Sequence, residues 1–221
     1  MFSKPNEVIE TKDYWIHHLV LGSFATNCYV LVCKATNACA VIDVAEQADD
    51  IHRFLKSRSL DPSYILITHA HIDHVHGCKR LKALYPKAVL ALHKDDYALA
   101  ANLGGQSRRF GFVPVEMPAV ELDLSTKHEI ELGRLRLELI HSPGHSPGHV
   151  CFYLKEQKTI FSGDLLFRHS IGRSDFEGGD AVVLKKSLDA LCERLADDVL
   201  VLPGHGEFTS IGSEKRENPF L

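Results

Sequence analysis

The sequence predicts an α+β protein in which two β-sheets pack face to face and helices cover their outer faces. Short apolar runs rich in strand-forming residues occur in groups, and segments with helical spacing of apolar residues follow them. This order occurs twice along the chain, whereas a doubly wound parallel sheet would alternate strands and helices throughout. With 221 residues, 45% of them hydrophobic, the chain is long enough to bury the core of such a layered structure.

The first half of the chain, about residues 1–120, is predicted to begin with a strand meander. Turn residues Gly22-Ser23 and Thr36-Asn37 separate the first three apolar runs. The predicted strands are 14–20, 28–33, 38–44, 64–67 and 88–92. The predicted helices are 47–58, 78–85, which Pro86 ends, and 94–101, which is expected to end near Gly104-Gly105. Residues 106–118 have no periodicity and are predicted to form a loop, either a substrate wall or lid or a plain connector.

The second half, about residues 121–221, repeats the order of strands followed by a helix. Residues 134–140 alternate charged and apolar side chains, which is typical of a half-exposed strand. Further strands are predicted at 150–154, 159–161 and 199–202, and an amphipathic helix at 182–195. We therefore expect one domain over residues 1–221, made of these two halves, with no separate C-terminal helical domain.

Composition and charge argue against several classes of protein. Lys and Arg total 25 and Asp and Glu total 29, a net charge of -4, so binding to nucleic acid or to a membrane surface is not expected. The N-terminus, M-F-S-K-P-N-E-V, has no apolar segment of signal-peptide length, and no stretch approaches the roughly 20 apolar residues of a membrane span. The six cysteines form no C-x-x-C pair and mostly lie in apolar runs, which predicts buried reduced thiols. We expect a cytoplasmic protein, and no feature of the sequence predicts an oligomeric state.

The segment T-H-A-H-I-D-H, residues 68–74, contains four side chains that commonly bind metals: His69, His71, Asp73 and His74. It follows the apolar run 64–67, so the ligands are expected on a loop at a strand end. In extended backbone, side chains two apart point to the same side, so His69, His71 and Asp73 can converge while His74 points elsewhere. This geometry suggests two neighbouring metals. The alternative, chance clustering in a chain with 14 histidines, is disfavoured because imidazoles packed this densely with a carboxylate are costly without a cation.

Three later residues complete the candidate ligand set, each in a turn framed by Gly or Pro. They are His145 in H-S-P-G-H-S-P-G-H, Asp164 in F-S-G-D, and His205 in L-P-G-H-G. Any one of them alone would be interpreted as structural. Together with the first cluster they make five histidines and two carboxylates, which suit two divalent ions, with Asp164 able to bridge them. Asp43, at the end of the third strand, is either a hydrogen-bond partner of a ligand or a loop cap.

The motifs T-H-A-H-I-D-H, G-H-S-P-G-H, S-G-D and P-G-H-G, in this order, resemble those of the metallo-β-lactamase superfamily. The resemblance implies a four-layer αβ/βα sandwich of two mixed β-sheets flanked by helices. Residues 163–180 and 203–221 look most like the short bacterial type II glyoxalases, the hydroxyacylglutathione hydrolases. The ligands implied for one zinc ion are His69, His71 and His145, and those for the other are Asp73, His74 and His205, with Asp164 between the two ions. Iron or manganese could replace zinc, and His76, His141 and His149 fall outside the ligand pattern.

The resemblance further implies an enzyme of methylglyoxal detoxification that hydrolyses the thioester of S-2-hydroxyacylglutathione, such as S-lactoylglutathione. In the implied mechanism a metal-bridging hydroxide attacks the thioester carbonyl, and Asp73 orients this nucleophile. Arg173 lies where the family has a basic residue that touches glutathione, although it could instead pair with Asp175 or Asp180. The longer type II glyoxalases use a helical C-terminal domain to clamp glutathione, so weak or broad thioester selectivity is expected here.

Two other functional interpretations stay open at the level of sequence. The glutathione-persulfide dioxygenases also resemble this chain, including its G-R-S-D-F segment, but they use a single iron held by two histidines and an aspartate. A lactonase, a phosphodiesterase or a binding protein of the same superfamily is the remaining possibility. The scarcity of positive charge argues against a tRNA-processing nuclease.

Overall fold

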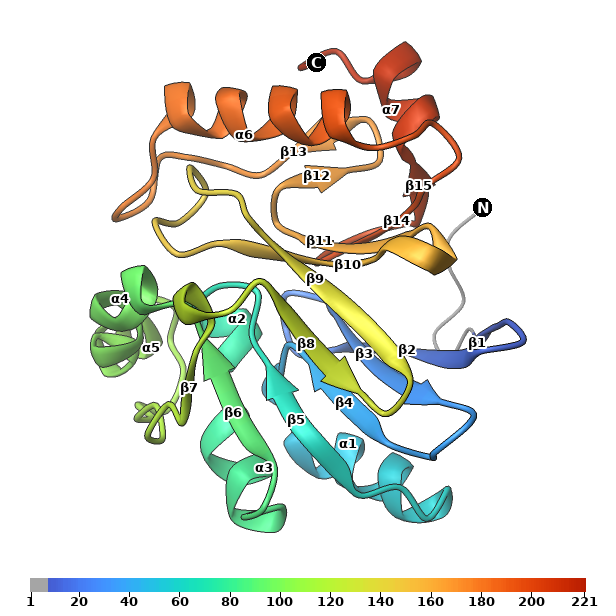
Figure 1. Ribbon diagram of the computed structural model, residues 1–221. Helices are drawn as coiled ribbons and strands as arrows, with labels where there is room; N and C mark the ends of the chain where they lie inside the picture. Colours follow the sequence, from blue (N-terminus) through green and yellow to red (C-terminus); the bar gives the residue numbers. More distant parts are fainter. Residues whose placement is uncertain (1–7) are drawn as a thin grey trace.

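Two mixed β-sheets lie at the centre of the molecule, and helices cover the outer face of each (Figure 1). The computed structural model describes residues 8–221, so residues 1–7, which include most of the N-terminal segment considered above, lie outside the described residues. The layers follow the order helices, sheet, sheet, helices. The predicted α+β sandwich of two sheets flanked by helices is therefore confirmed.

The first sheet contains seven strands in the order β1 to β7. Neighbours from β1 to β4 are antiparallel and neighbours from β4 to β7 are parallel, so the sheet is mixed. Its strands are β1 (Val8–Glu10), β2 (Tyr14–Leu21), β3 (Thr26–Cys33), β4 (Cys39–Ile42), β5 (Pro62–Leu66), β6 (Val89–Leu92) and β7 (Leu122–Asp123). Every residue of β3 is buried, because alternate side chains of this central strand enter the cores on its two faces.

Helices α1 and α3 cover the outer face of the first sheet (Figure 1). Ile51 and Leu55 of α1 and Leu81 of α3 are fully buried against it. The helical segments of this half are α1 (Ala48–Ser57), α2 (Ile72–Val75), α3 (Cys78–Leu84), the 3₁₀ turn η1 (Lys94–Asp96), α4 (Tyr97–Ala101) and α5 (Leu103–Arg109). Among residues 8–221 no helix is long and apolar enough to cross a membrane, and the cytoplasmic location stays a prediction.

The second sheet has the order β15-β14-β11-β10-β9-β8, and only β11 and β14 are parallel neighbours in it. Its strands are β8 (Glu129–Leu132), β9 (Leu135–His141), β10 (Val150–Leu154), β11 (Thr159–Gly163), β14 (Leu200–Pro203) and β15 (Thr209–Ser210). The other elements of this half are the turns η2 (Leu124–Thr126) and η3 (Lys155–Gln157), the hairpin β12 (Leu166–Phe167) and β13 (Ser170–Ile171), and the helices α6 (Ala181–Arg194) and α7 (Ile211–Glu217). Leu184, Leu188 and Leu191 form the buried stripe of α6, as the sequence pattern predicts.

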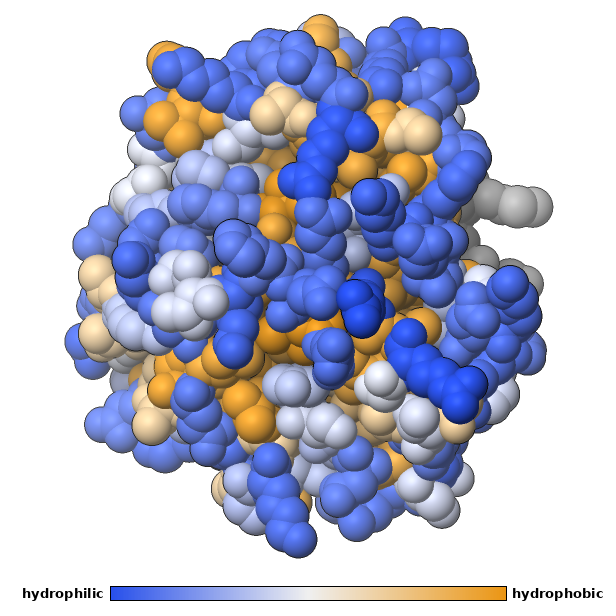
Figure 2. All heavy atoms as spheres, viewed as in Figure 1, coloured by the Kyte–Doolittle hydropathy of each residue, from blue (hydrophilic) through white to orange (hydrophobic). Residues whose placement is uncertain are grey.

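The space between the two sheets is filled by apolar side chains from both halves of the chain. Leu31 and Ile42 of the first sheet pack in one cluster with Phe152 and Phe161 of the second. Hydrophilic side chains cover most of the surface in Figure 2, with hydrophobic patches between them. The two sheets therefore share one continuous core, which fixes the position of their strand ends relative to each other.

The segment after η1 differs from the sequence prediction. The helix expected to end near Gly104-Gly105 is followed directly by α5, which passes through both glycines and includes residues 106–109 of the predicted loop. Gln106 explains this, because its side chain accepts a hydrogen bond from the Ile72 amide and donates to the carbonyls of Ala70 and Leu99. Tertiary hydrogen bonds thus outweigh the low helix propensity of glycine.

Candidate metal centre

The seven candidate ligands all lie at one edge of the sandwich, where strands from both sheets end. His69, His71, Asp73 and His74 follow β5, and His145 lies in the loop between β9 and β10. Asp164 directly follows β11, and His205 follows β14. Because parallel neighbours end at the same edge of a sheet, the loops after β11 and β14 place their side chains close together.

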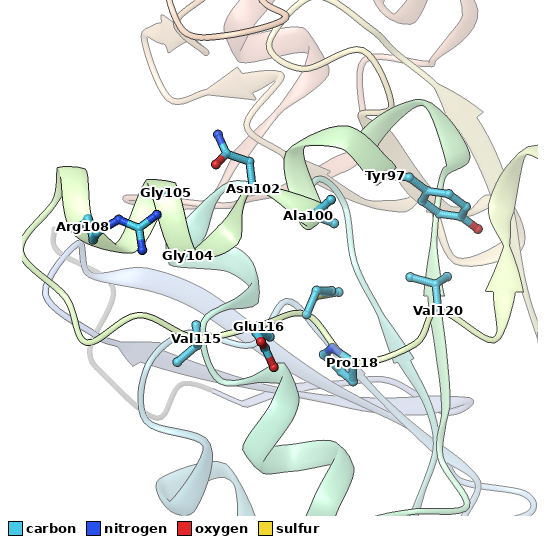
Figure 3. A pocket seen from close by; sticks show the side chains of 12 residues that line it. Tyr97, Ala100, Asn102, Gly104, Gly105, Arg108, Val115, Glu116, Pro118 and Val120 are labelled. Carbon is cyan, nitrogen blue, oxygen red and sulfur yellow. The ribbon is translucent and has the colours of Figure 1, made fainter.

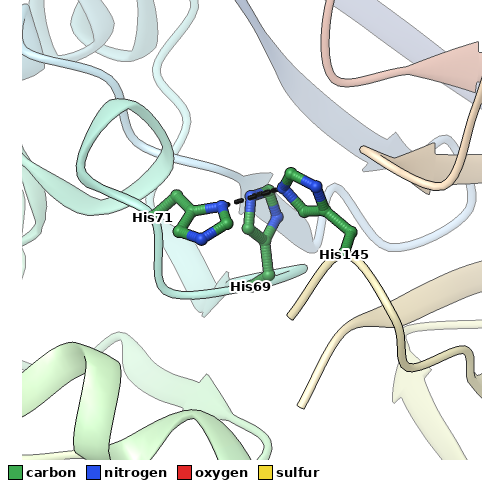
Figure 4. A group of neighbouring side chains, drawn as sticks. All are labelled: His69, His71 and His145. Carbon is green, nitrogen blue, oxygen red and sulfur yellow. Dashed lines mark hydrogen bonds between the residues drawn. The ribbon is translucent and has the colours of Figure 1, made fainter. Parts of the chain in front are cut away.

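Three imidazoles form the first group, shown in Figure 4. The Nε2 atom of His145 lies 2.8 Å from Nδ1 of His71 and 3.1 Å from Nε2 of His69. Burial and the neighbouring histidines lower the pKa of His69. Burial and then His145 lower the pKa of His71 to about 3. Both rings are therefore neutral at pH 7. Ring nitrogens of a tetrahedral zinc site lie about 3.3 Å apart, given zinc–nitrogen bonds of about 2.0–2.1 Å, so this spacing suits a divalent ion.

Asp73, His74 and His205 form the second group. The Oδ2 atom of Asp73 lies 3.0 Å from Nε2 of His205 and 3.4 Å from Nε2 of His74, and these two nitrogens are 3.3 Å apart. The expectation that Asp73 converges with His69 and His71 is wrong. The extended backbone ends at His71, which is the N-cap of α2, and the helical turn carries Asp73 away towards His205.

The carboxylate of Asp164 lies between the two groups. Its Oδ1 is 3.4 Å from Nε2 of His74, and its Oδ2 is 3.6 Å from Nε2 of both His145 and His205. Oδ1 is buried and has no hydrogen-bond partner among the described residues. Burial raises the pKa of Asp164, but His74 and His205 lower it more, so the carboxylate is ionised. A buried anionic oxygen is costly without a hydrogen-bond donor or a nearby cation, and metal ions would satisfy it, so the donor set fits two divalent ions. Metal binding by these residues stays a prediction.

Asp43 orients ligands of both groups. It has a left-handed backbone conformation with φ of 57°, and its Oδ2 accepts hydrogen bonds of 2.8 Å from Nδ1 of His74 and from the hydroxyl of Thr68. Nδ1 of His69 in turn donates to that hydroxyl at 3.0 Å. Both imidazoles therefore carry their proton on Nδ1 and present the lone pair of Nε2 to the site. This supports the interpretation of Asp43 as a partner of a ligand.

Two further side chains connect the ligand loops. His149 accepts a 3.0 Å hydrogen bond from the Asp164 amide and fixes the turn after β11. Asp96 is fully buried and accepts hydrogen bonds from the Ala70 amide at 2.8 Å, the Ser146 hydroxyl at 2.8 Å and the Gly148 amide at 2.6 Å. Asp96 thereby joins the loop of His69 to that of His145. The sequence analysis missed Asp96 because no local signal separates it from neighbouring Asp95.

A cavity of about 530 Å³ opens over the ligands and is large enough for a small-molecule substrate. Its walls include Phe24, Phe110, Phe167 and Phe176. Gln106, Arg109 and Phe110 also line it, which supports the substrate-wall interpretation for this part of residues 106–118.

Arg173 lines the same cavity, but its guanidinium is already paired. It donates two hydrogen bonds of 2.7 Å to Asp175, whereas Asp180, the other expected partner, caps α6. Its backbone carbonyl accepts a 2.7 Å hydrogen bond from Nδ1 of His145 and so orients that ring. A substrate contact by Arg173 stays a prediction.

Comparisons with known proteins agree with this geometry. The chain is 35% identical to a protein of Haemophilus influenzae named hydroxyacylglutathione hydrolase GloC, over 93% of this chain and 97% of the relative. A crystal structure of the B3 metallo-β-lactamase BLEG-1 has a TM-score of 0.86 at 33% identity, covering 93% of this chain and 99% of the other. A structure of TTHA1623 in a di-iron-bound form has a TM-score of 0.84 at 34% identity, covering 92% and 99% of the two chains.

A more distant structural neighbour is ETHE1 from Myxococcus xanthus, with a TM-score of 0.76 at 26% identity over 92% of this chain and 83% of the other. The family model described as the metallo-β-lactamase superfamily matches residues 21–205, which include all seven candidate ligands. With that match over most of its length and the αβ/βα layers that carry the ligands at one edge, the chain belongs to the metallo-β-lactamase superfamily.

Proposed function

We propose that this chain hydrolyses the thioester of S-2-hydroxyacylglutathione, such as S-lactoylglutathione, with two divalent ions that we take to be zinc. The observation that carries the proposal is the pair of three-ligand groups joined by Asp164 on the floor of a 530 Å³ cavity. The relative named hydroxyacylglutathione hydrolase supports this choice of substrate. The histidine-rich donor set suits zinc, and the di-iron neighbour makes iron the first alternative.

The side chains divide the work of hydrolysis between them. Bound divalent ions lower the pKa of coordinated water to near 7 and polarise a carbonyl oxygen. Asp73 lines the cavity 3.0 Å from His205, and we assign it the orientation of the attacking water through a hydrogen bond. Phe24, Phe110 and Phe176 line the cavity, and we assign them the apolar wall beside the substrate. The thiolate of glutathione is a good leaving group, so no strong general acid is required.

The two halves of the chain share this function. Ligands come from both, with His69 and Asp73 in the first and His145, Asp164 and His205 in the second. Neither half holds a complete pair of ligand groups, and one apolar core contains side chains of both sheets. We therefore propose that residues 1–221 act as one domain.

The proposal is tested with metal-loaded protein by measuring metal content and hydrolysis of S-lactoylglutathione on one preparation. The variants His71→Ala, His145→Ala and Asp164→Ala should lower bound metal and reduce turnover by at least about a hundredfold. The control is His52→Ala, because His52 lies on α1, outside the groups of described residues that could hold a metal, and its ring bonds the hydroxyl of Tyr85. A protein that leaves the thioester intact while opening lactones or β-lactams would contradict the assignment.

The second candidate function is oxidation of a glutathione persulfide by a single iron. One observation favours it: His69, His74 and Asp164 form a compact set of two histidines and one carboxylate, as in mononuclear iron oxygenases, and ETHE1 is a structural neighbour. The ordered group of Asp73 and His205 favours two ions instead. One iron per chain together with persulfide-dependent oxygen uptake would establish the persulfide dioxygenase.

A further inference from the structure

Two arginines line the cavity, and only one of them is held in an ion pair within residues 8–221. Arg173 is engaged in the two hydrogen bonds to Asp175 and lies 3.7 Å from the centre of the Phe176 ring. Arg109, the last residue of α5, forms no ion pair within residues 8–221, although Glu177 also lines the cavity. Its guanidinium carbon lies 5.2 Å from the centre of the Phe176 ring and 5.9 Å from that of Phe110. The charge of Arg109 helps to lower the pKa of Asp175, after the larger effect of Arg173, but Arg173 occupies the hydrogen bonds of that carboxylate. Among the described residues, Arg109 is therefore the arginine of this cavity that is not held in an ion pair.

The position of Arg109 relative to the metal centre is fixed by Gln106, one helical turn earlier. The three hydrogen bonds of Gln106 reach the Ile72 amide at 2.9 Å and the carbonyls of Ala70 and Leu99 at 3.1 and 3.0 Å. Ala70 and Ile72 flank His71, so α5 is attached directly to the ligand loop. The backbone that carries Arg109 is therefore held at a fixed place relative to the ligand loop.

We propose that Arg109 binds a free carboxylate of the substrate, at the part of the cavity wall that Phe110 and Phe176 form. This inference rests on the proposed thioesterase function and defines its substrate class as thioesters whose thiol portion carries a carboxylate, as glutathione does. The planar guanidinium can donate two parallel hydrogen bonds to a carboxylate, and the adjacent Phe110 and Phe176 rings reduce competition from water. Arg173 then acts as a scaffold, through its pair with Asp175 and its carbonyl bond to His145.

Binding of S-hexylglutathione, which has no thioester, tests this inference without turnover. Its dissociation constant is measured by isothermal titration calorimetry on metal-loaded protein, for the free acid and for its dimethyl ester. The variant Arg109→Gln should weaken binding of the acid about tenfold and leave binding of the ester unchanged, since one charge-assisted contact is lost. The ratio of the two constants is the readout, because damage to the cavity would weaken both ligands alike.

Arg108 provides a matched control. It precedes Arg109 on the same helix and carries the same charge, but it lines a separate cavity with Asn102 and Glu116 (Figure 3). Arg108→Gln should bind both ligands within twofold of the original chain.

Kinetics on S-lactoylglutathione separate the inference from the proposed function. Arg109→Gln should raise KM about tenfold with kcat within about twofold, and Arg109→Lys should recover part of the loss. Hydrolysis with equal KM in the Arg109→Gln and Arg108→Gln variants would overturn the inference alone. If the protein does not hydrolyse S-lactoylglutathione, but Arg109→Gln still weakens binding of the acid form of S-hexylglutathione, the proposed reaction alone would be overturned. Failure of S-hexylglutathione to bind, or an equal loss for acid and ester, would also overturn the inference.

Discussion

Gly204 occupies a position where any larger side chain would displace the carboxylate of Asp164, which lies between the two ligand groups. A Cβ atom at residue 204 would lie 2.1 Å from Oδ1 of Asp164 and 2.8 Å from Cε1 of His74. Carbon atoms rarely approach such an oxygen closer than 3.0 Å, so Gly204→Ala requires a shift of about 1 Å in the carboxylate or in the P-G-H-G turn. A metal–oxygen bond of about 2.0–2.2 Å does not survive a shift of that size.

We therefore expect Gly204→Ala to fold but to bind fewer ions and to lose about a hundredfold in turnover. The overpacked turn should also cost about 1–3 kcal/mol of unfolding free energy. The number of metal ions per chain is measured after dialysis, and turnover is measured with S-lactoylglutathione. The free energy of unfolding is measured by urea unfolding of the metal-free protein.

The matched control is Gly206→Ala, two residues further along the same turn. No heavy atom lies within 4 Å of its added Cβ, although its φ of 75° makes alanine unfavourable by roughly 1–2 kcal/mol. The control thus loses comparable stability without touching Asp164. Two ions per chain and normal turnover in Gly204→Ala, or an equal loss of metal in Gly206→Ala, would refute the reasoning.

Three further predictions concern the groups around the site and the core. Asp43→Asn should lower the affinity for the metal held by His74 about 10- to 100-fold, measured by competition with a chelator, because the orienting carboxylate is lost. Asp96→Asn should destabilise the protein by about 2–4 kcal/mol in urea unfolding, since an amide cannot accept all three hydrogen bonds; a change below 0.5 kcal/mol, on the order of surface substitutions, would refute this role. Burial, with nearby Arg58, lowers the pKa of His17 to about 4, so the unfolded chain binds this proton first and stability falls as pH drops from about 6.5 towards 4. His17→Gln should therefore show about 1–2 kcal/mol less loss than the original chain between pH 7.5 and pH 5, and parallel losses would exclude His17 as a source.

The ligand types and most strands could be predicted from the sequence, because both depend on local chemistry. Alternating or continuous apolar residues define β9 and β10 whatever their partners are. The short elements α2, β12 and β13 escaped prediction because two to four residues carry no readable period. For α2 this mattered, since that single helical turn decides that Asp73 joins His205 and not His69.

The sequence by itself determined which side chains can bind metal and that apolar layers must enclose them, because residue type and periodicity are local properties. Only the tertiary structure decided which ligands share a group, that Asp43 and Asp96 hold their loops, and that Arg173 is paired while Arg109 is not. Apart from the local pair of Arg173 and Asp175, these outcomes depend on contacts between residues 25 or more positions apart, which form when the two sheets pack and bring their strand ends to one edge.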